Sequence, residues 1–362
     1  MRIFVDIGHP AHVHVLKNLL WVLQRNNHEI KITTRDKEIT IYLLDHYGFN
    51  YENLGKNKKG LFNKAVGLVE FDYKLFKIAR SFNPDIFVGV GSIYAAHVAA
   101  LMRKPCILFD DTENSTEQYM LYAPFVTVVC TPACFKKDLG SKQIRYPGYH
   151  ELTYLHPNHF TPDPDVLDRL GLSEDEKLIL VRFVSWGASH DIKDKGFDKP
   201  VDIVKRLEQY GRVVITSERG LPEELIAYRM NLPPENIHHL MYYASLYIGE
   251  SATMASESAI LGTPAVFVST SRRGYTDEQE ENYGLVYTFS DPVQGQIQAL
   301  DKAIELLSEK NLKREWARRR DIMLSERIDV TAFMVDLIEG YPDSLTQVLK
   351  KYECSVNGGL PR

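Results

Sequence analysis

Small and hydroxyl-bearing residues follow an apolar run at residues 246–249 and open a helical pattern. The segment reads Tyr247-Ile248-Gly249-Glu250-Ser251-Ala252-Thr253-Met254-Ala255-Ser256-Glu257. Small side chains let a ligand approach the backbone, and the amides of a helix N-terminus bind phosphate. Ser251 and Thr253 add hydroxyl donors, and Glu257 lies about two turns beyond Gly249, within reach of a ligand's sugar hydroxyls. The alternative is an ordinary strand–turn–helix unit with a serine cap.

A second polar group follows the first apolar run of the chain, at residues 2–7. Gly8 ends this run, and His9 and His12 lie where a helical pattern begins. A histidine beside the carboxyl end of a strand can be neutral near pH 7 and act as general base on an acceptor hydroxyl. The alternative leaves both histidines as polar residues of a helix start, without chemistry.

Two more polar clusters also follow apolar runs. Asp110 begins an acidic stretch that could orient acceptor hydroxyls, act as a base or hold a cation, and solvated loop charges are the alternative. Arg182 ends another run and precedes Ser185, Ser189 and His190. These residues could bind and neutralise a leaving nucleotide diphosphate, as a transferase without a metal requires. The alternative is a structural arginine.

The hydrophobic pattern predicts the scaffold that positions these clusters. Short β-rich runs alternate with helical patterns, and continuous apolar strands indicate parallel sheets covered on both faces. A proline-rich stretch at 146–165 interrupts the pattern and is predicted to be a linker. Its histidines, His150 among them, have no nearby cysteines and are not expected to bind a metal.

We therefore expect three parts in this α/β protein. They are a Rossmann-like domain at 1–150 on the acceptor side, a second Rossmann-like domain at 165–340 on the donor side, and a C-terminal helix and tail at 341–362. Open parallel sheets bind ligands at the carboxyl ends of their strands. The ligand site is therefore expected in a central cleft between the two domains.

Composition restricts the partners. The 362 residues include 43 Lys and Arg against 48 Asp and Glu, a net charge of −5 that supplies no general attraction to nucleic acid. No apolar run reaches the roughly 18 residues of a membrane span, and the start lacks a secretory signal. The four cysteines lack Cys-x-x-Cys spacing and are typical of reduced thiols, so a cytoplasmic location is expected.

One helical stretch, at 56–80, combines lysines with apolar residues. Such a helix could contact an anionic membrane or a lipid-linked acceptor, which would place the protein at the inner membrane face. Glu70 and Asp72 interrupt its positive charge, so an ordinary surface helix is the alternative.

Residues 250–257 and the following Leu261-Gly262-Thr263-Pro264 resemble the donor-nucleotide motif of the GT-B superfamily. That superfamily includes nucleotide-sugar glycosyltransferases and nonhydrolysing UDP-N-acetylglucosamine 2-epimerases. The resemblance implies two doubly wound, Rossmann-like parallel-sheet domains facing a central cleft. It also implies that Glu257 binds ribose hydroxyls and that Ser251, Ala252 and Thr253 lie against the diphosphate.

Other segments extend the resemblance. Residues 8–13 resemble the first Gly/His loop of MurG-like glycosyltransferases, whose histidine matches His12. The whole chain is most similar to a GT-B family of archaeal and bacterial proteins known only as a domain of unknown function. GT-B proteins often contact the donor sugar after the strand that corresponds to residues 265–268, which implies roles for Tyr275, Asp277 and Gln279. An acidic, solvated helix start is the alternative there.

The resemblance to the epimerases is incomplete. Asp110 falls near one of their catalytic acids, but Gly89-Val90-Gly91-Ser92 stands where they carry a further acidic residue, and their His-Arg-Arg-Glu-like segment is absent. We therefore expect a glycosyltransferase that moves a sugar from a nucleotide-diphosphate donor, UDP-linked, to a hydroxyl acceptor. His12 or Asp110 would take the acceptor proton, with no metal or other cofactor. The alternatives are an epimerase-like nucleotide-sugar isomerase and a non-catalytic nucleotide-sugar-binding protein.

Overall fold

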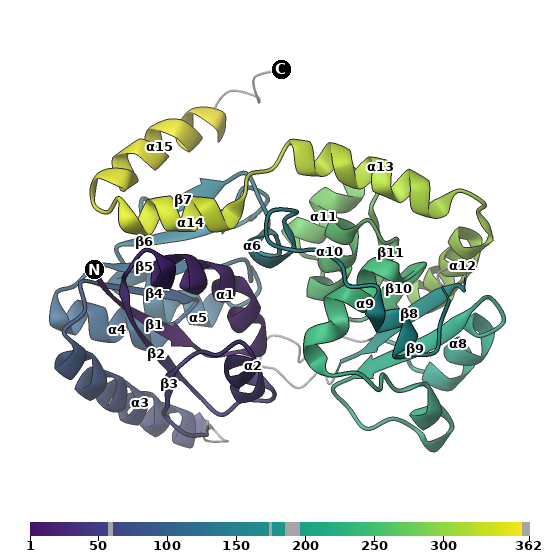
Figure 1. Cartoon of the computed structure of the whole chain (residues 1–362), viewed down its shortest axis with the longest axis horizontal. Coiled ribbons are helices and arrows are strands. Elements are labelled where there is room, and N and C mark those ends of the chain that lie inside the picture. Colours follow the sequence, from purple (N-terminus) through teal and green to yellow (C-terminus); the bar gives the residue numbers. More distant parts are fainter. Residues whose placement is uncertain (57–60, 174–175, 185–195, 357–362) are drawn as a thin grey trace. The chain divides into compact units, whose positions relative to one another are not determined.

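The computed structural model describes residues 1–56, 61–173, 176–184 and 196–356 (Figure 1). The chain divides into two compact units. The first unit contains Met1–Tyr154 and Ile328–Arg362, and the second contains Leu155–Arg327. Each unit contains one parallel sheet flanked by helices, which confirms the predicted α/β class.

Seven described strands form the sheet of the first unit. They are β1 (Arg2–Ile7), β2 (Glu29–Thr34), β3 (Tyr51–Asn53), β4 (Ile86–Val90), β5 (Cys106–Phe109), β6 (Val128–Pro132) and β7 (Gln143–Tyr146). Their order is β3-β2-β1-β4-β5-β6-β7, and every pair is parallel. The order reverses between β1 and β4, and in doubly wound sheets ligands bind beside the carboxyl ends of the strands at such a reversal.

Helices cover both faces of this sheet. They are α1 (Pro10–Arg25), α2 (Thr40–His46), α3 (Leu61–Phe82), α4 (Ile93–Met102), α5 (Thr116–Tyr122), α14 (Val330–Glu339) and α15 (Asp343–Val356), with a 3-10 turn η1 at Ala123–Phe125. On one face, Phe4 of β1 packs in a core with Phe71 and Leu75 of α3 and with residues of α4 and α5. α1 begins at Pro10, whose missing N–H costs nothing at a first helical position.

The sheet of the second unit has five described strands. They are β8 (Leu178–Phe183), β9 (Arg212–Ser217), β10 (Leu246–Gly249), β11 (Ala265–Val268) and β12 (Val286–Phe289), in the parallel order β12-β11-β10-β8-β9. The helices are α7 (Asp165–Asp168), α8 (Pro200–Leu207), α9 (Ile237–Tyr243), α10 (Ala252–Leu261), α11 (Gly274–Glu281), α12 (Gly295–Ser308) and α13 (Leu312–Ser325). The 3-10 helices are η2 (Glu223–Tyr228) and η3 (Pro234–Asn236), and a short helix, α6 (Leu152–Leu155), lies where the first unit meets the second in sequence. Here the strand order reverses between β8 and β10.

The limits of the two units differ from the predicted domains. The second domain was expected to extend to residue 340, but the chain returns to the first unit at Ile328. The Ile328 N–H donates to the Pro147 carbonyl, and the Thr331 hydroxyl donates to the Thr153 carbonyl at 2.8 Å. α14 therefore belongs to the first unit, where most of its side chains are buried. Its apolar pattern alone does not distinguish between the two sheets.

The predicted linker at 146–165 is also folded over its first half. Tyr146 ends β7, and the side chains of Tyr149 and His150 are buried in the first unit. Proline and histidine interrupt the periodic pattern in this stretch without loosening the packing.

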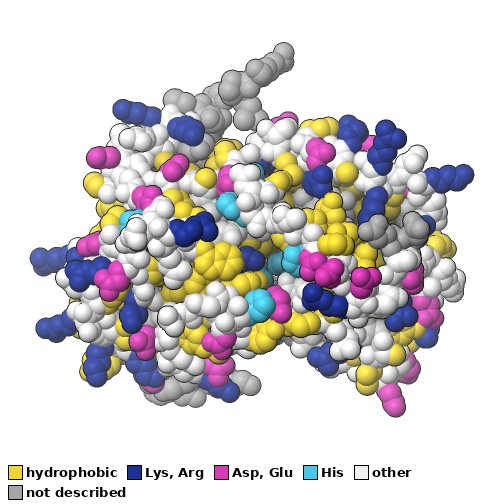
Figure 2. All heavy atoms as spheres, in the orientation of Figure 1, with side chains coloured by type: hydrophobic (Ala, Val, Ile, Leu, Met, Phe, Trp, Pro, Cys, Tyr) yellow, Lys and Arg dark blue, Asp and Glu magenta, His cyan; other side chains and the backbone are white. Residues whose placement is uncertain are grey.

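α3 is the helix predicted to contact a membrane. Figure 2 shows Lys and Arg side chains over α3 with Asp and Glu side chains among them, and Lys74 pairs with Glu70 at 2.9 Å. Much of its apolar face is used for the core, since Phe71 and Leu75 are buried, whereas Val69 is exposed. In the part of the chain that the structure describes, no helix has both the length and the apolarity needed to span a bilayer. Peripheral membrane contact stays a prediction.

Candidate functional site

In the second unit, the start of α10 has the features of an anion site. Ser251 is its N-cap, with an extended backbone, and its hydroxyl accepts the Met254 N–H at 3.3 Å. Ser251, Ala252 and Thr253 are partly exposed, whereas the remainder of α10 is buried. The partial positive charge of the helix is therefore presented at a turn that a ligand can reach.

Arg182 lies beside this turn. In the register of β8 and β10 it pairs with Gly249, and a Cβ on Gly249 would lie 2.7 Å from the Arg182 Cβ, so only glycine fits there. The Arg182 guanidinium forms an ion pair with Glu218, and its Nε is buried with no hydrogen-bond partner among the described residues. A bound diphosphate would share this arginine with Glu218.

Glu257 lies on α10 and is buried. Its Oε1 is 2.9 Å from Nε2 of His238, which projects from α9. His238 lies near the start of α9, and no local pattern shows that it contacts a residue nineteen positions later. A ribose bound at Glu257 would therefore meet a carboxylate whose orientation His238 already fixes.

Glu250 was not among the predicted ligand residues, and the structure gives it a clear task. Its carboxylate accepts the N–H groups of Val184 at 2.7 Å and Phe197 at 2.6 Å, and it lies 3.4 Å from an Arg219 nitrogen. Burial raises the pKa of Glu250, although both backbone donors and the arginine oppose that shift. Glu250 thus holds the described ends on either side of residues 185–195.

Three predicted ligand residues, Ser185, Ser189 and His190, lie outside the described residues. Their expected contacts with the diphosphate stay predictions.

Gly196 gives a test of the role of Glu250 in holding the backbone at Val184 and Phe197. Replacing it by alanine should lower the free energy of unfolding by about 1–3 kcal/mol, because the new Cβ would collide with the buried Glu250 carboxylate. Gly220→Ala is the matched control, since no heavy atom lies within 4 Å of a Cβ built there. Thermal unfolding of both variants measures the difference, and equal melting temperatures would contradict the role given to Glu250.

Tyr275 and Gln279, the predicted donor-sugar contacts, both lie on α11 and are buried. The Gln279 side-chain amide donates to the Ser256 hydroxyl at 2.9 Å, which joins α11 to α10. Gln279 is fully buried, and the contacts of Tyr275 and Gln279 with a donor sugar stay predictions.

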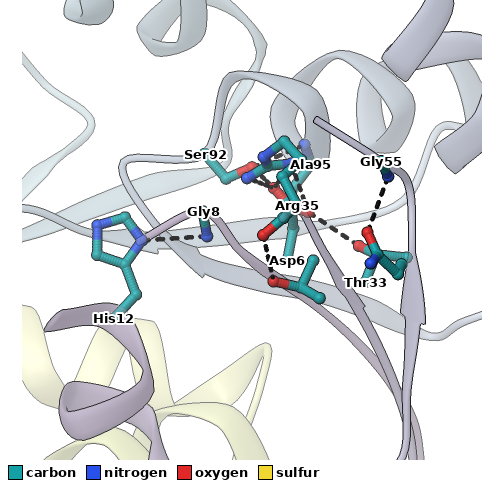
Figure 3. Close-up of polar contacts among 10 residues, drawn as sticks. Asp6, Gly8, His12, Thr33, Arg35, Gly55, Ser92 and Ala95 are labelled. Atoms are coloured by element: carbon teal, nitrogen blue, oxygen red, sulfur yellow. Dashed lines mark hydrogen bonds and ion pairs between the residues drawn. The ribbon is translucent and has the colours of Figure 1, made fainter. Parts of the chain in front are cut away.

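In the first unit, an ion pair lies at the reversal between β1 and β4 (Figure 3). Both Arg35 terminal nitrogens donate to the Asp6 carboxylate at 2.9–3.0 Å. Asp6 also accepts the hydroxyls of Thr33 and Ser92, at 2.9 and 2.5 Å. Asp6 is fully buried and Arg35 nearly so, and every strong acceptor position of the carboxylate is used.

The Gly/His loop packs against this pair. A Cβ on Gly8 would lie 2.5 Å from an Arg35 nitrogen, so the close approach requires glycine. His9 caps α1, since its Nδ1 accepts the Ala11 N–H at 3.2 Å. The Gly8 N–H points at Nδ1 of His12, at 3.4 Å (Figure 3). Burial lowers the pKa of His12 well below its usual value, and nearby positive charges lower it further, so His12 is neutral at pH 7.

Asp110 follows β5 and is almost completely buried. It accepts the Tyr122 hydroxyl at 2.7 Å and the Thr112 N–H at 2.9 Å. Burial raises the pKa of Asp110 from 3.8 to about 6 despite these donors. Its neighbour Asp111 lies 3.4 Å from Nδ1 of His150. The carboxyl edge of the first sheet thus brings together His12, Asp110, Asp111 and His150.

The raised pKa of Asp110 predicts a pH-dependent stability. Between about pH 4 and 6 the folded protein holds a proton that the unfolded chain has released, so the free energy of unfolding falls as pH rises through this range. The loss should reach roughly 3 kcal/mol above pH 6. Asp110→Asn should remove this decline, and urea denaturation at pH 4.5, 6.0 and 7.5 measures it. Parallel curves for the variant and the wild type would contradict the assignment.

Among the residues that the structure describes, no three His, Cys, Asp or Glu side chains gather closely enough to hold a metal ion.

The fold matches solved structures of a UDP-GlcNAc 2-epimerase and of a glycosyltransferase. A UDP-GlcNAc 2-epimerase from Neisseria meningitidis bound to UDP-GlcNAc covers 94% of this chain and all (100%) of its own, with a TM-score of 0.66 and 13% identity. The Streptomyces sp. SF2575 glycosyltransferase SsfS6 covers 94% of this chain and 99% of its own, with a TM-score of 0.58 and 14% identity. The protein therefore has the GT-B fold, as the resemblance implied.

Comparison of the sequence with a family model assigns the chain to a protein family. The family model described as "Protein of unknown function (DUF354)" matches residues 1–337, and the chain belongs to this family. A relative is the uncharacterized protein MJ0665 of Methanocaldococcus jannaschii, 25% identical over 280 residues that cover 74% of this chain and 81% of that protein.

Proposed function

We propose that the protein is a glycosyltransferase that uses a nucleotide-diphosphate sugar, with UDP as the nucleotide. The observation that carries the proposal is the start of α10, where a capped and partly exposed turn lies at the strand reversal beside Arg182. The helix amides and Arg182 would bind the diphosphate, and Glu257 would bind the ribose hydroxyls. The solved structures of similar fold support this ligand class, because one of them holds UDP-GlcNAc.

The first unit would hold the acceptor. In the transfer, an acceptor oxygen forms a bond to the anomeric carbon as the bond from that carbon to the diphosphate oxygen breaks. The nucleoside diphosphate leaves with the electron pair, and the acceptor proton passes to a side chain of the first unit. The loop amides, Arg182 and Glu257 would stabilise the leaving group, so the proposal requires no metal or cofactor.

Gly91 favours a transferase over an epimerase. It follows β4, where the resembling epimerases carry an acidic residue, and it has a positive φ of 51°. A Cβ there would lie 2.8 Å from the Gln118 side chain and 3.0 Å from Asp110. The Gln118 and Asp110 side chains would have to move to admit a side chain there, and the Gly89-Val90-Gly91-Ser92 stretch carries no acidic residue to serve as the second acid that an epimerase needs.

Mass spectrometry of reactions with UDP-GlcNAc and other UDP-sugars tests the proposal. With a library of hydroxyl acceptors, we expect UDP release together with a sugar added to one acceptor. With UDP-GlcNAc alone, we expect no epimer. An epimer formed without acceptor would replace the transferase by the isomerase, and UDP binding without turnover of any donor would leave a nucleotide-sugar-binding protein.

A further inference from the structure

His12 and His150 carry opposite hydrogen-bond arrangements. A neutral imidazole has one nitrogen that donates and one that accepts. In His12 the accepting nitrogen is Nδ1, because the Gly8 N–H points at it from 3.4 Å. Neutral His12 therefore carries its proton on Nε2, and the nitrogen left for a ligand is a donor.

The surroundings of Gly8 hold this arrangement in place. Gly8 packs directly on the Arg35 guanidinium (Figure 3). Two nitrogens of this guanidinium donate to the Asp6 carboxylate and hold it in place. The ring of Tyr94 lies 4.7 Å from the guanidinium carbon of Arg35. Because Arg35 is fixed from several directions, the Gly8 N–H keeps its direction towards His12.

His150 shows the reverse arrangement. Its Nδ1 lies 3.4 Å from an Asp111 carboxylate oxygen, and its Nε2 is buried with no hydrogen-bond partner in the described part of the chain. Burial alone would raise the pKa of Asp111, but the charge and hydrogen bond of His150 and the Thr112 hydroxyl lower it, so Asp111 is an acceptor-only carboxylate. The shared hydrogen therefore belongs to Nδ1 of His150, and in the neutral form of this imidazole Nε2 carries a lone pair.

The His150 ring is also held in its plane. Tyr146 stacks on it with an interplanar angle of 14° and a centroid distance of 6.4 Å. The side chain is 4% exposed, which keeps bulk water from the Nε2 lone pair. A carboxylate on one imidazole nitrogen and a lone pair on the other is the arrangement that a general base requires.

We propose that His150, oriented by Asp111, takes the proton of the acceptor hydroxyl, and that His12 binds the acceptor as a hydrogen-bond donor. This inference rests on the proposed glycosyl transfer. The proton moves from the acceptor hydroxyl to Nε2 of His150 as the acceptor oxygen bonds to the anomeric carbon and the nucleoside diphosphate leaves. His150 is then a catalytic residue, and Asp111 is its positioning residue. The charged or titratable neighbours of His150 include Asp111, Asp110, His12 and the stacked Tyr146.

Imidazole nitrogen spectra test the geometry without any substrate. Two-bond proton–nitrogen correlations on histidine-labelled wild type report which nitrogen carries the proton, and His12→Gln and His150→Gln assign the two rings. We expect the proton on Nε2 in His12 and on Nδ1 in His150. The same tautomer in both rings, or the reverse pair, would overturn the inference.

Activity with the donor and acceptor found for the wild type tests the chemistry. His150→Gln should lower kcat/KM by about 10²–10⁴-fold, whereas His12→Gln, which keeps a side-chain donor, should lose less than about tenfold. Asp111→Asn should lower kcat with KM nearly unchanged, because it affects the orientation and charge of His150 and not the binding of substrate. His156→Gln is the matched control from the same stretch of chain and should match the wild type.

UDP affinity separates a folding defect from a catalytic one, because the proposed donor residues lie in the second unit. Wild-type UDP affinity in His150→Gln with lost turnover supports the inference. Full turnover in His150→Gln, or a larger loss in His12→Gln, would overturn it. If the wild type transfers no sugar from any nucleotide donor, the proposed function fails, and the nitrogen spectra still decide between the two tautomer assignments.

Discussion

Asp6→Ala should lower the free energy of unfolding by about 3–5 kcal/mol, because it leaves a buried guanidinium without its counter-charge. Asp6 is fully buried, and Arg35 is 4% exposed. The variant also removes the acceptor of the Thr33 and Ser92 hydroxyls, which adds unsatisfied donors to the cost. Urea denaturation followed by far-ultraviolet circular dichroism measures the loss.

The control is an exposed ion pair between strands of the same sheet. Lys31 and Glu52 lie 3.4 Å apart, and their side chains are 35% and 51% exposed. Glu52→Ala should therefore cost less than about 1 kcal/mol. Equal losses in the two variants would mean that the Asp6–Arg35 pair does not hold the first unit together.

Glu257→Ala should weaken UDP binding by roughly 10- to 150-fold, which corresponds to about 1.5–3 kcal/mol. The loss is expected because a ribose with two hydroxyls would form charge-assisted hydrogen bonds to this buried carboxylate. Titration calorimetry with UDP gives the affinity directly.

Glu315→Ala serves as the matched control for Glu257. Glu315 lies on α13 of the same unit and pairs with Arg318 and Arg319, with no proposed contact to the ligand. Its UDP affinity should equal that of the wild type. An unchanged affinity in Glu257→Ala would remove Glu257 from the nucleotide site.

Much of the fold could be predicted from local patterns. Continuous apolar runs such as Ile86–Val90 become the central strands of parallel sheets, since strands buried on both faces carry no alternation. The strand Gln143–Tyr146 was missed because its polar and apolar residues alternate within a proline-bounded stretch. The helix Thr116–Tyr122 was missed because it follows an acidic loop and is only seven residues long.

Part of the candidate site was predictable from the geometry of parallel sheets. In each sheet, the residues at the carboxyl ends of the strands gather along one edge. Gly8 and Asp110 could therefore be placed on the first sheet, and Arg182 and Ser251 on the second, from the sequence. The contacts between residues far apart in the sequence could not be predicted in this way. Glu250 bonds to backbone amides 53 and 66 positions away, and no local pattern encodes such a contact.

His150 shows most clearly which contacts the sequence does not predict. Its proline-rich neighbourhood was interpreted as a linker, although the side chain is buried beside Asp111, thirty-nine positions earlier. The two come together because β7 pairs with β6 and β6 pairs with β5, and this arrangement depends on the whole sheet.

The central claim is that the second unit binds a nucleoside diphosphate at the start of α10. Titration of isotope-labelled protein with UDP, followed in backbone amide spectra, tests it most directly. We expect saturable shifts of the Ser251, Ala252 and Thr253 amides, with a single binding constant. Millimolar UDP that leaves these three amides unshifted would contradict the account.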